Sequence, residues 1–392
     1  MPFHYRPMVT ACLGLCLGIA FAHILSGIWL FAAVCLFSVL GLVAWWQDMP
    51  AWRTLALWAV AGLLRPALLP AFTPPSGFMR PFLTLRFRLI DLSEKLFGAQ
   101  APLLTAMLWG DTIGLSPTVY DAYKGAGILH VLALSGLNVS FVTAALNTLF
   151  RRVKESARLA LTAALLVCYC AIAAFPPSLV RASVMSLCVL FGGVSGRKGD
   201  MASGIAFAAL AILLPTPEAM YDVGFQLSFA AVAVIAMLSG ALQSKLPLPK
   251  PVAGTLALSV CGTLGTLPLT MYYFREVAVL SIFANILILP VVPFAFLCAM
   301  AANLAAVILP RLGEFLAPTA CLLADCMVVP AQYVSSVPFA LLRVKRPGLL
   351  ACAAVYLALL AASRYCLWER KKQYAAAGAL ALLAALLYGV GL

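Results

Sequence analysis

The run IWLFAAVCLFSVLGLVAWW, residues 28–46, decides the fold class, because it carries no charged side chain and is long enough to cross a bilayer as a helix. At a rise of about 1.5 Å per residue, about 20 apolar residues span the hydrocarbon core. The whole chain has this character: 64% of its 392 residues are hydrophobic, 10% are charged and the mean hydropathy is +1.04. Such a composition excludes an ordinary soluble enzyme and a disordered protein, and it predicts a membrane protein.

Similar runs lie on both sides of residues 28–46. We count roughly twelve apolar segments and expect about eleven of them to span the membrane. The sequence therefore predicts an all-α, polytopic integral membrane protein with one interfacial amphipathic helix and, as an alternative for residues 277–292, a re-entrant helix. We expect four regions: N-terminal membrane helices (1–70), an external amphipathic segment (71–100), a membrane core (101–310) and C-terminal membrane helices (311–392).

The stretch 70–98 differs from the apolar runs in composition. It contains several prolines and basic residues, and its large apolar side chains recur at spacings of three and four: Phe82, Leu85, Leu89, Leu92 and Leu96. This spacing gathers them on one face of a helix. We therefore expect an amphipathic helix that lies in the membrane interface and does not span it.

The basic loops predict the orientation of the chain. Lys and Arg outnumber Asp and Glu by 26 to 13, and such a surplus is typical of cytoplasmic loops. If the densest basic loop, residues 151–158, is cytoplasmic, the N-terminus is also cytoplasmic and the stretch 70–98 is external. The basic clusters 343–346 and 370–372 conflict, because a single expected span separates them. A re-entrant helix at 277–292 would put 370–372 inside, and 343–346 and the C-terminus outside.

Metal binding and catalysis are not expected. The 12 cysteines lie in apolar runs without flanking histidines, which is typical of packing and not of a metal site. On one helix, His130 and Ser135 would lie about 140° apart around the axis, too far to act as base and nucleophile. We therefore expect no metal, no cofactor and no enzymatic activity.

A few polar side chains fall inside the apolar runs, where they are costly and usually face a cavity or a partner. They include His130, Asn138, Arg181, Gln226 and Asn285. Each also has a purely structural interpretation. His130 and Arg181 can reach the headgroups, and the amides can form hydrogen bonds between helices. For the run around Asn285, which ends at Pro290, we expect a broken or kinked helix.

Residues 127–139, GILHVLALSGLNV, resemble the central signature of the ComEC-type competence proteins. Further blocks match that family in the same order: LWGD (108–111), VRASVM (180–185), DVGFQLSF (222–229), TLPL (266–269) and FANILILP (283–290). A single block is weak evidence, but several blocks in the same order over about half of the chain are specific evidence for a resemblance to this family.

The resemblance implies a channel component in the bacterial inner membrane that takes up single-stranded DNA in natural transformation. It implies a conduit whose candidate lining residues are His130, Ser135, Gly136, Asn138, Arg181, Gln226, Ser228, Asn285, Asp111 and Lys124. It implies structural roles for Gly110, Gly127, Phe225, Pro268 and Pro290. We expect the interruption near Asn285 and Pro290 to abut this conduit. The implied partners are single-stranded DNA, membrane lipid, and separate OB-like, nuclease or cytoplasmic helicase chains.

The sequence also departs from this family. The OB-like and metallo-β-lactamase-like domains of full-length members are expected to be absent, since only residues 70–98 occupy the place of the former. The family's Ser-Gly-Leu-His reads Ser-Gly-Leu-Asn here, so Asn138 keeps its hydrogen bonding but cannot titrate. A transporter of another anionic substrate on the same scaffold, or an inactive remnant, is therefore the alternative.

Overall fold

Helices make up nearly all the regular structure of the computed structural model, which describes residues 6–25, 28–47, 49–68, 76–132, 134, 136–194, 201–363 and 370–390. The first elements are α1 (Pro7–Ile24), α2 (Ile28–Trp46), α3 (Pro50–Leu68), α4 (Ser76–Phe97), η1 (Gly98–Gln100), α5 (Ala101–Trp109), α6 (Pro117–Gly125), η2 (Leu129–Val131), α7 (Gly136–Leu149), α8 (Glu155–Ile172) and α9 (Pro177–Val194). Then follow α10 (Met201–Leu213), η3 (Pro217–Tyr221), α11 (Val223–Gln243), α12 (Lys250–Phe274), β1 (Glu276–Ala278), α13 (Ser281–Ile288), α14 (Val292–Ile308), α15 (Pro310–Ser335), β2 (Leu341–Arg343), α16 (Leu349–Ala362) and α17 (Arg370–Val390).

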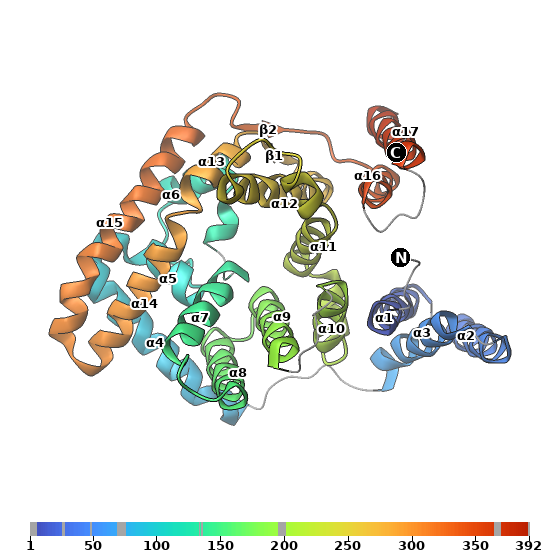
Figure 1. Cartoon of the computed structure of the whole chain (residues 1–392), viewed down its shortest axis with the longest axis horizontal. Coiled ribbons are helices and arrows are strands. Elements are labelled where there is room, and N and C mark those ends of the chain that lie inside the picture. Colours follow the sequence, from blue (N-terminus) through green and yellow to red (C-terminus); the bar gives the residue numbers. More distant parts are fainter. Residues whose placement is uncertain are drawn as a thin grey trace.

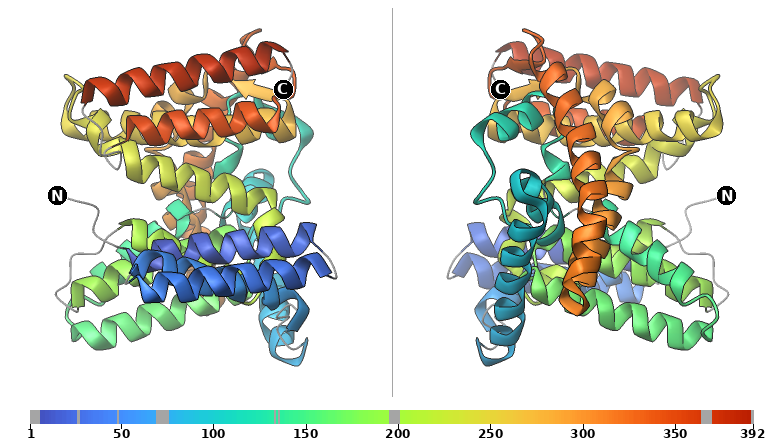
Figure 2. Two further views of the ribbon diagram at one scale, coloured as in Figure 1. Left: turned by 90° about the vertical axis from the view of Figure 1, so that its right-hand side faces the viewer. Right: turned by 90° about the vertical axis from the view of Figure 1, so that its left-hand side faces the viewer.

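Many of the apolar helices share one direction. Helices α1, α2, α3, α10, α11 and α17 are seen nearly end-on in Figure 1 and lie side-on, roughly parallel, in Figure 2. Helices that cross one bilayer share a direction within a modest tilt, so this direction marks the membrane normal. Helix α4 runs across it, and so does α15, although α15 is long and apolar enough to span a membrane.

Length and hydropathy confirm a polytopic helical membrane protein. Within the described residues, five helices qualify as spans (α1, α8, α11, α12 and α15), and α13 with α14 would form a sixth as one bent span. Further apolar helices of 10–17 residues accompany them. The total of about eleven spans stays a prediction.

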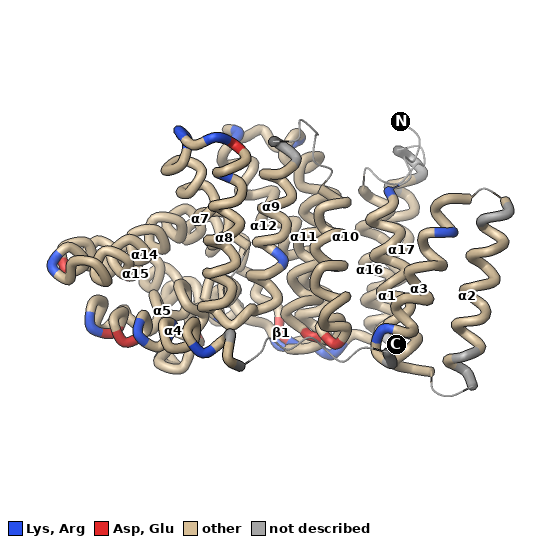
Figure 3. The backbone as a smooth tube through the Cα atoms, turned by 90° about the horizontal axis from the view of Figure 1, so that it is seen from below, with Lys and Arg blue, Asp and Glu red and all other residues tan. Residues whose placement is uncertain are grey.

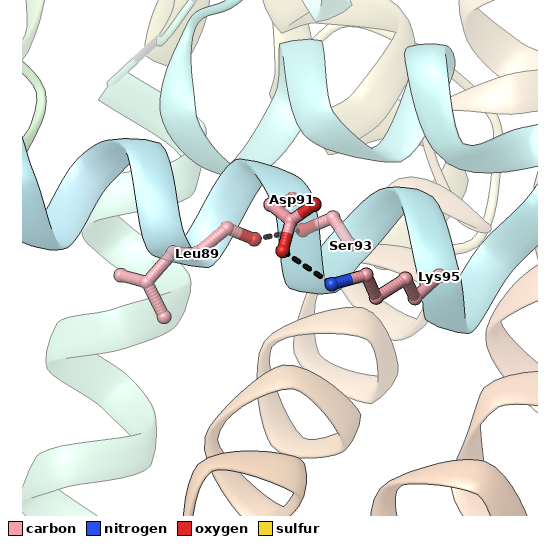
Figure 4. Close-up of polar contacts among 4 residues, drawn as sticks. All are labelled: Leu89, Asp91, Ser93 and Lys95. Carbon is pink, nitrogen blue, oxygen red and sulfur yellow. Dashed lines mark hydrogen bonds and ion pairs between the residues drawn. The ribbon is translucent and has the colours of Figure 1, made fainter.

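Helix α4 is the amphipathic helix expected within residues 70–98. Its buried face carries Leu89, Ser93 and Phe97, and the Ser93 hydroxyl donates to the Leu89 carbonyl over 2.8 Å. Its exposed face carries the Asp91 and Lys95 ion pair, with 2.6 Å between Nζ and Oδ2 (Figure 4). In Figure 3, where α1 to α3 stand upright, α4 lies along the lower edge of the molecule with its charged residues. The apolar face packs into the protein core, and the position of α4 in the membrane interface stays a prediction.

The basic loop 151–158 and α4 lie at opposite ends of α8. The loop leads into the N-terminal end of α8, whereas the Arg86 guanidinium of α4 donates to the carbonyl of Ala173, the residue that ends α8, over 3.0 Å. Figure 3 shows the same separation, with the α7–α8 connection at the upper edge and α4 at the lower edge. This arrangement agrees with the prediction that the two segments lie on opposite sides of the membrane.

The run 277–292 does not form one continuous helix. Its first two residues pair in β1, α13 covers eight residues, and α14 starts after a break at an angle of 50° to α13. Pro290 lies in the break, where a missing N–H prevents the helix from continuing. The interruption expected near Asn285 and Pro290 is therefore confirmed.

Strands β1 and β2 join the two ends of the α13–α15 unit. Glu276 pairs with Arg343 and Ala278 with Leu341 in an antiparallel register. Because β1 precedes α13 and β2 follows α15, the unit starts and returns at the same end of α12. The Arg346 guanidinium carbon lies 3.9 Å from the ring centroid of Tyr272, which fixes the 343–346 cluster at the end of α12 opposite Lys250.

Helix α5 lies at the centre of the main core. Its residues from Leu103 to Trp109 are all buried, with the Trp109 and Tyr169 rings packed edge to face at 6.4 Å between centroids. A helix that is apolar on every side is a buried helix. Helices α4 and α14 pack on it, and Asn138 of α7 donates a hydrogen bond to it.

Candidate functional site

Arg181 is a cation buried among apolar helices. It lies one turn into α9, and 5% of its surface is exposed. Its Nη2 atom lies 3.8 Å from the position that a Cβ atom would take at Gly136, and its guanidinium carbon lies 5.5 Å from the ring centroid of Phe229 on α11. Its Nε and Nη1 atoms have no hydrogen-bond partner among the described residues. Arg181 thus contacts both α7 and α11 and keeps free donors.

The helices that pack on α9 offer Arg181 no nearby counter-charge. Helices α7, α10 and α11 contain no Asp or Glu, and neither does α9 itself. Helix α8 carries Glu155 at its opposite end, 3.8 Å from Arg158. Asp222, just before α11, caps that helix by accepting the Phe225 N–H over 2.8 Å. A buried charge is unfavourable without compensation, so this arrangement favours binding of an anion.

Helix α7 starts later than the sequence predicts. We expect a span from residue 130, but the helix begins at Gly136, and the exposed His130 lies before it in η2. Before η2, Gly127 adopts a left-handed conformation with a φ of +71°, and a Cβ atom there would lie 2.6 Å from the Cβ atoms of Ala278 and Ser281. Ser135 lies outside the described residues. The angle predicted between His130 and Ser135 on a single helix does not apply.

Asn138 faces the protein core and not Arg181. It is 1% exposed, and its Nδ2 atom donates to the Met107 carbonyl on α5 over 3.1 Å. Gly136 and Asn138 are two residues apart, which separates them by about 200° around a helix. Its hydrogen bond joins two helices, and a cavity shared by Asn138 and Arg181 stays a prediction.

Gln226 lies one turn from Phe229 on α11, but its amide is already used. Its Nε2 atom donates to the Met220 carbonyl over 3.0 Å, and its Oε1 atom accepts the Tyr273 hydroxyl over 2.8 Å. Phe225 is buried and packs on Phe229 with 4.3 Å between ring centroids, whereas Ser228 is half-buried. Gln226 therefore links η3, α11 and α12, and its role in a conduit stays a prediction.

Asn285 is also used in packing. Its Nδ2 atom donates to the Ser259 hydroxyl on α12 over 2.8 Å, and its buried Oδ1 atom has no partner among the described residues. Pro268, on the same helix as Ser259, accepts the Cys352 thiol through its carbonyl over 3.6 Å. Helix α12 thereby joins the broken α13–α14 pair to α16.

The last two candidate charges lie in loops and ion pairs. Asp111 follows Gly110, whose φ of +71° ends α5, and its Oδ1 atom accepts the Ile113 N–H over 3.3 Å. Lys124 on α6 forms an ion pair with Glu276 on β1, with 2.9 Å between Nζ and Oε2. Lys124 is thus neutralised, whereas we expect it to supply free charge to a conduit.

Several contacts of this region carry no signal in the sequence. The Ser178 hydroxyl donates to the Leu134 carbonyl over 2.6 Å, and the Tyr169 hydroxyl donates to the Leu108 carbonyl over 2.9 Å. Ser93 accepts hydrogen bonds from Trp109 and from Asn303. Only Asn303, an amide inside an apolar run, could have been suspected from the sequence.

Residues 107–372 match the model of the family described as "Competence protein". This chain belongs to the competence protein family. The matched region includes Arg181 and its two neighbours, Gly136 and Phe229.

Two curated relatives match parts of this competence protein. The "ComE operon protein 3" of Bacillus subtilis (strain 168) is 30% identical over 244 residues, which cover 61% of this chain and 30% of the relative. The "Uncharacterized protein MG316 homolog" of Mycoplasma pneumoniae (strain ATCC 29342 / M129 / Subtype 1) is 28% identical over 184 residues, which cover 46% of each chain. The chain thus spans less than half the length of either relative. No solved structure matches it.

Proposed function

We propose that this competence protein forms the membrane conduit through which single-stranded DNA enters the cell in natural transformation. Family membership supports a role in DNA uptake. The convergence on Arg181 supports a conduit in particular, because Gly136, Arg181 and Phe229 come from three separate sequence blocks and meet around one buried cation. A strand carries one negative charge per nucleotide, so its path requires cations that are shielded from lipid.

The conduit needs no chemistry of its own. We propose that the protein is not an enzyme and that it resides in the bacterial inner membrane with a cytoplasmic N-terminus and a cytoplasmic loop 151–158. Arg151, Arg152, Lys154 and Arg158 gather at that face and would attract the emerging strand. Strand binding outside the membrane, nuclease activity and helicase activity would come from other chains or domains.

Deletion of the gene in a transformable host tests this proposal. We expect transformation to fail and labelled DNA to remain outside the cytoplasm, while the wild-type gene in trans restores entry. Complementation with Arg181→Ala should restore membrane expression but not entry. Normal transformation and normal strand entry in the deletion strain would contradict the proposal and favour a transporter of a different anionic substrate.

A further inference from the structure

We propose that Arg181 and the first turn of α7 form an oxyanion site that holds one phosphate of the translocating strand. The assignment of the phosphate to nucleic acid rests on the proposed function, whereas the oxyanion site itself rests on the geometry. No other candidate of the site combines burial, free donors and a missing counter-charge among the described residues.

The start of α7 lies next to Arg181. The first N–H groups of any α-helix lack acceptors within the helix, and the aligned peptide dipoles leave a partial positive charge there. Helix α7 begins at Gly136, which has no side chain to cover these groups, and the Nη2 atom of Arg181 lies 3.8 Å from its would-be Cβ position. Helix N-termini of this kind bind phosphate groups.

The Arg181 guanidinium is held in place while its donors stay available. Phe229 lies on one side, with 5.5 Å between the guanidinium carbon and the ring centroid, a distance typical of a cation–π contact. Nε and Nη1 have no partner among the described residues, although both are buried. The Leu134 carbonyl accepts the Ser178 hydroxyl over 2.6 Å and is not an acceptor for Nε or Nη1.

The charge balance selects an anion as the ligand. Arg is protonated at every physiological pH, so the site cannot become neutral by losing a proton. Helices α7, α9, α10 and α11 contain no carboxylate, and the carboxylate of Asp222 caps α11. A phosphate offers a negative charge and several acceptor oxygens, which match a guanidinium and adjacent backbone N–H groups.

The first test uses purified full-length protein and a fluorescent oligothymidylate. Dissociation constants are measured over a series of salt concentrations for the wild type, Arg181→Gln and Arg181→Lys. Loss of one phosphate contact lowers the slope of log K against log salt by about 0.7 for single strands. We expect this reduction in Arg181→Gln and weaker binding with an unchanged slope in Arg181→Lys. The control is Arg311→Gln, which removes an equal charge from the exposed start of α15 and should leave the slope unchanged.

The second test uses inorganic phosphate alone. Phosphate should raise the Tm of the wild type relative to chloride at equal ionic strength, because it binds the folded state, and should leave the Tm of Arg181→Gln unchanged. If Arg181→Gln does not fold, Gly136→Ala decides the matter. The added methyl group would lie 3.6 Å from the Cβ atom of Ala182 and 3.8 Å from Nη2 of Arg181, so it fits without a clash. This variant keeps Arg181, and the methyl group should weaken the effect of phosphate on the Tm by filling the space before α7.

The outcomes separate this inference from the proposed function. A phosphate effect that depends on Arg181, without oligothymidylate binding, would support the oxyanion site and contradict the DNA conduit. Strand entry and slopes that are unchanged in both Arg181→Gln and Gly136→Ala would overturn the oxyanion site and leave the conduit standing.

Discussion

Asn138 donates a hydrogen bond to the carbonyl oxygen of Met107 over 3.1 Å, and this contact joins the signature helix α7 to the buried helix α5. Met107 is fully buried, so its carbonyl cannot turn to water if the donor is removed. The position has a structural role that a sequence motif alone does not distinguish from a role in transport.

Asn138→Leu should therefore destabilise the protein. An unpaired buried carbonyl costs about 1–3 kcal/mol, and we expect a lower Tm of the purified protein in detergent. Asn138→His retains an N–H donor, so its Tm should fall less than that of Asn138→Leu. Asn147→Leu, at a half-buried position of the same helix, is the matched control. Equal Tm values for the two Leu variants would contradict a structural role for Asn138.

The ion pair between Lys124 and Glu276 predicts that the charge of Lys124 is not needed for strand entry. If Lys124 only neutralises Glu276, the double variant Lys124→Glu with Glu276→Lys should keep the pair and support normal strand entry. Lys124→Met alone leaves a half-buried carboxylate unpaired and should lower the Tm. Loss of entry in a stable double variant would mean that the charge of Lys124 itself contacts the strand.

The opposite positions of α4 and the loop 151–158 predict how cysteines react. In a background without reactive thiols, Glu94→Cys on the exposed face of α4 should react with a membrane-impermeant maleimide in intact cells. Ser156→Cys should react only after permeabilisation. Reaction of both cysteines from outside would refute the topology.

The pairing of β1 with β2 predicts the side on which α17 ends. The α13–α15 unit returns to the end of α12 at which it starts, so the 343–346 cluster lies opposite the Lys250 end of α12. In Figure 3 the two helices that follow, α16 and α17, stand upright. If each of them crosses the membrane once, α17 ends on the same side as the 343–346 cluster, which is the external face. A reporter that is active only in the cytoplasm should therefore be inactive when fused after Leu392. Activity of that fusion would refute the arrangement.

Features set by neighbouring residues could be predicted from the sequence. The spacing of Leu89 and Leu92 predicts the amphipathic α4, Ser116 before Pro117 predicts the start of α6, and Pro290 predicts the break after α13. Each of these signals lies within one or two turns of the structure that it produces. The distribution of charge over the loops also predicts that α4 and the loop 151–158 lie on opposite sides of the membrane.

Features set by distant residues could not be predicted. Strands β1 and β2 have three residues each and pair across more than 60 intervening positions, which leaves no local pattern. The partners of Asn138 and Lys124 lie on elements that only the folded chain brings close. The sequence identifies Arg181 as costly inside a membrane, but Phe229 as its neighbour follows only from the packing of α9 on α11.

The burial of α5 has a consequence for biogenesis. With nine residues, α5 is about 14 Å long, less than half of the hydrocarbon thickness, so it cannot be inserted as an independent span. The carbonyls at its end receive donors from Asn138 and Tyr169, which are synthesised later. During translation α5 must therefore wait until α7 and α8 emerge from the ribosome. Nascent chains that stall before α8 would leave the Leu108 carbonyl without the Tyr169 hydroxyl and would be substrates for membrane quality control.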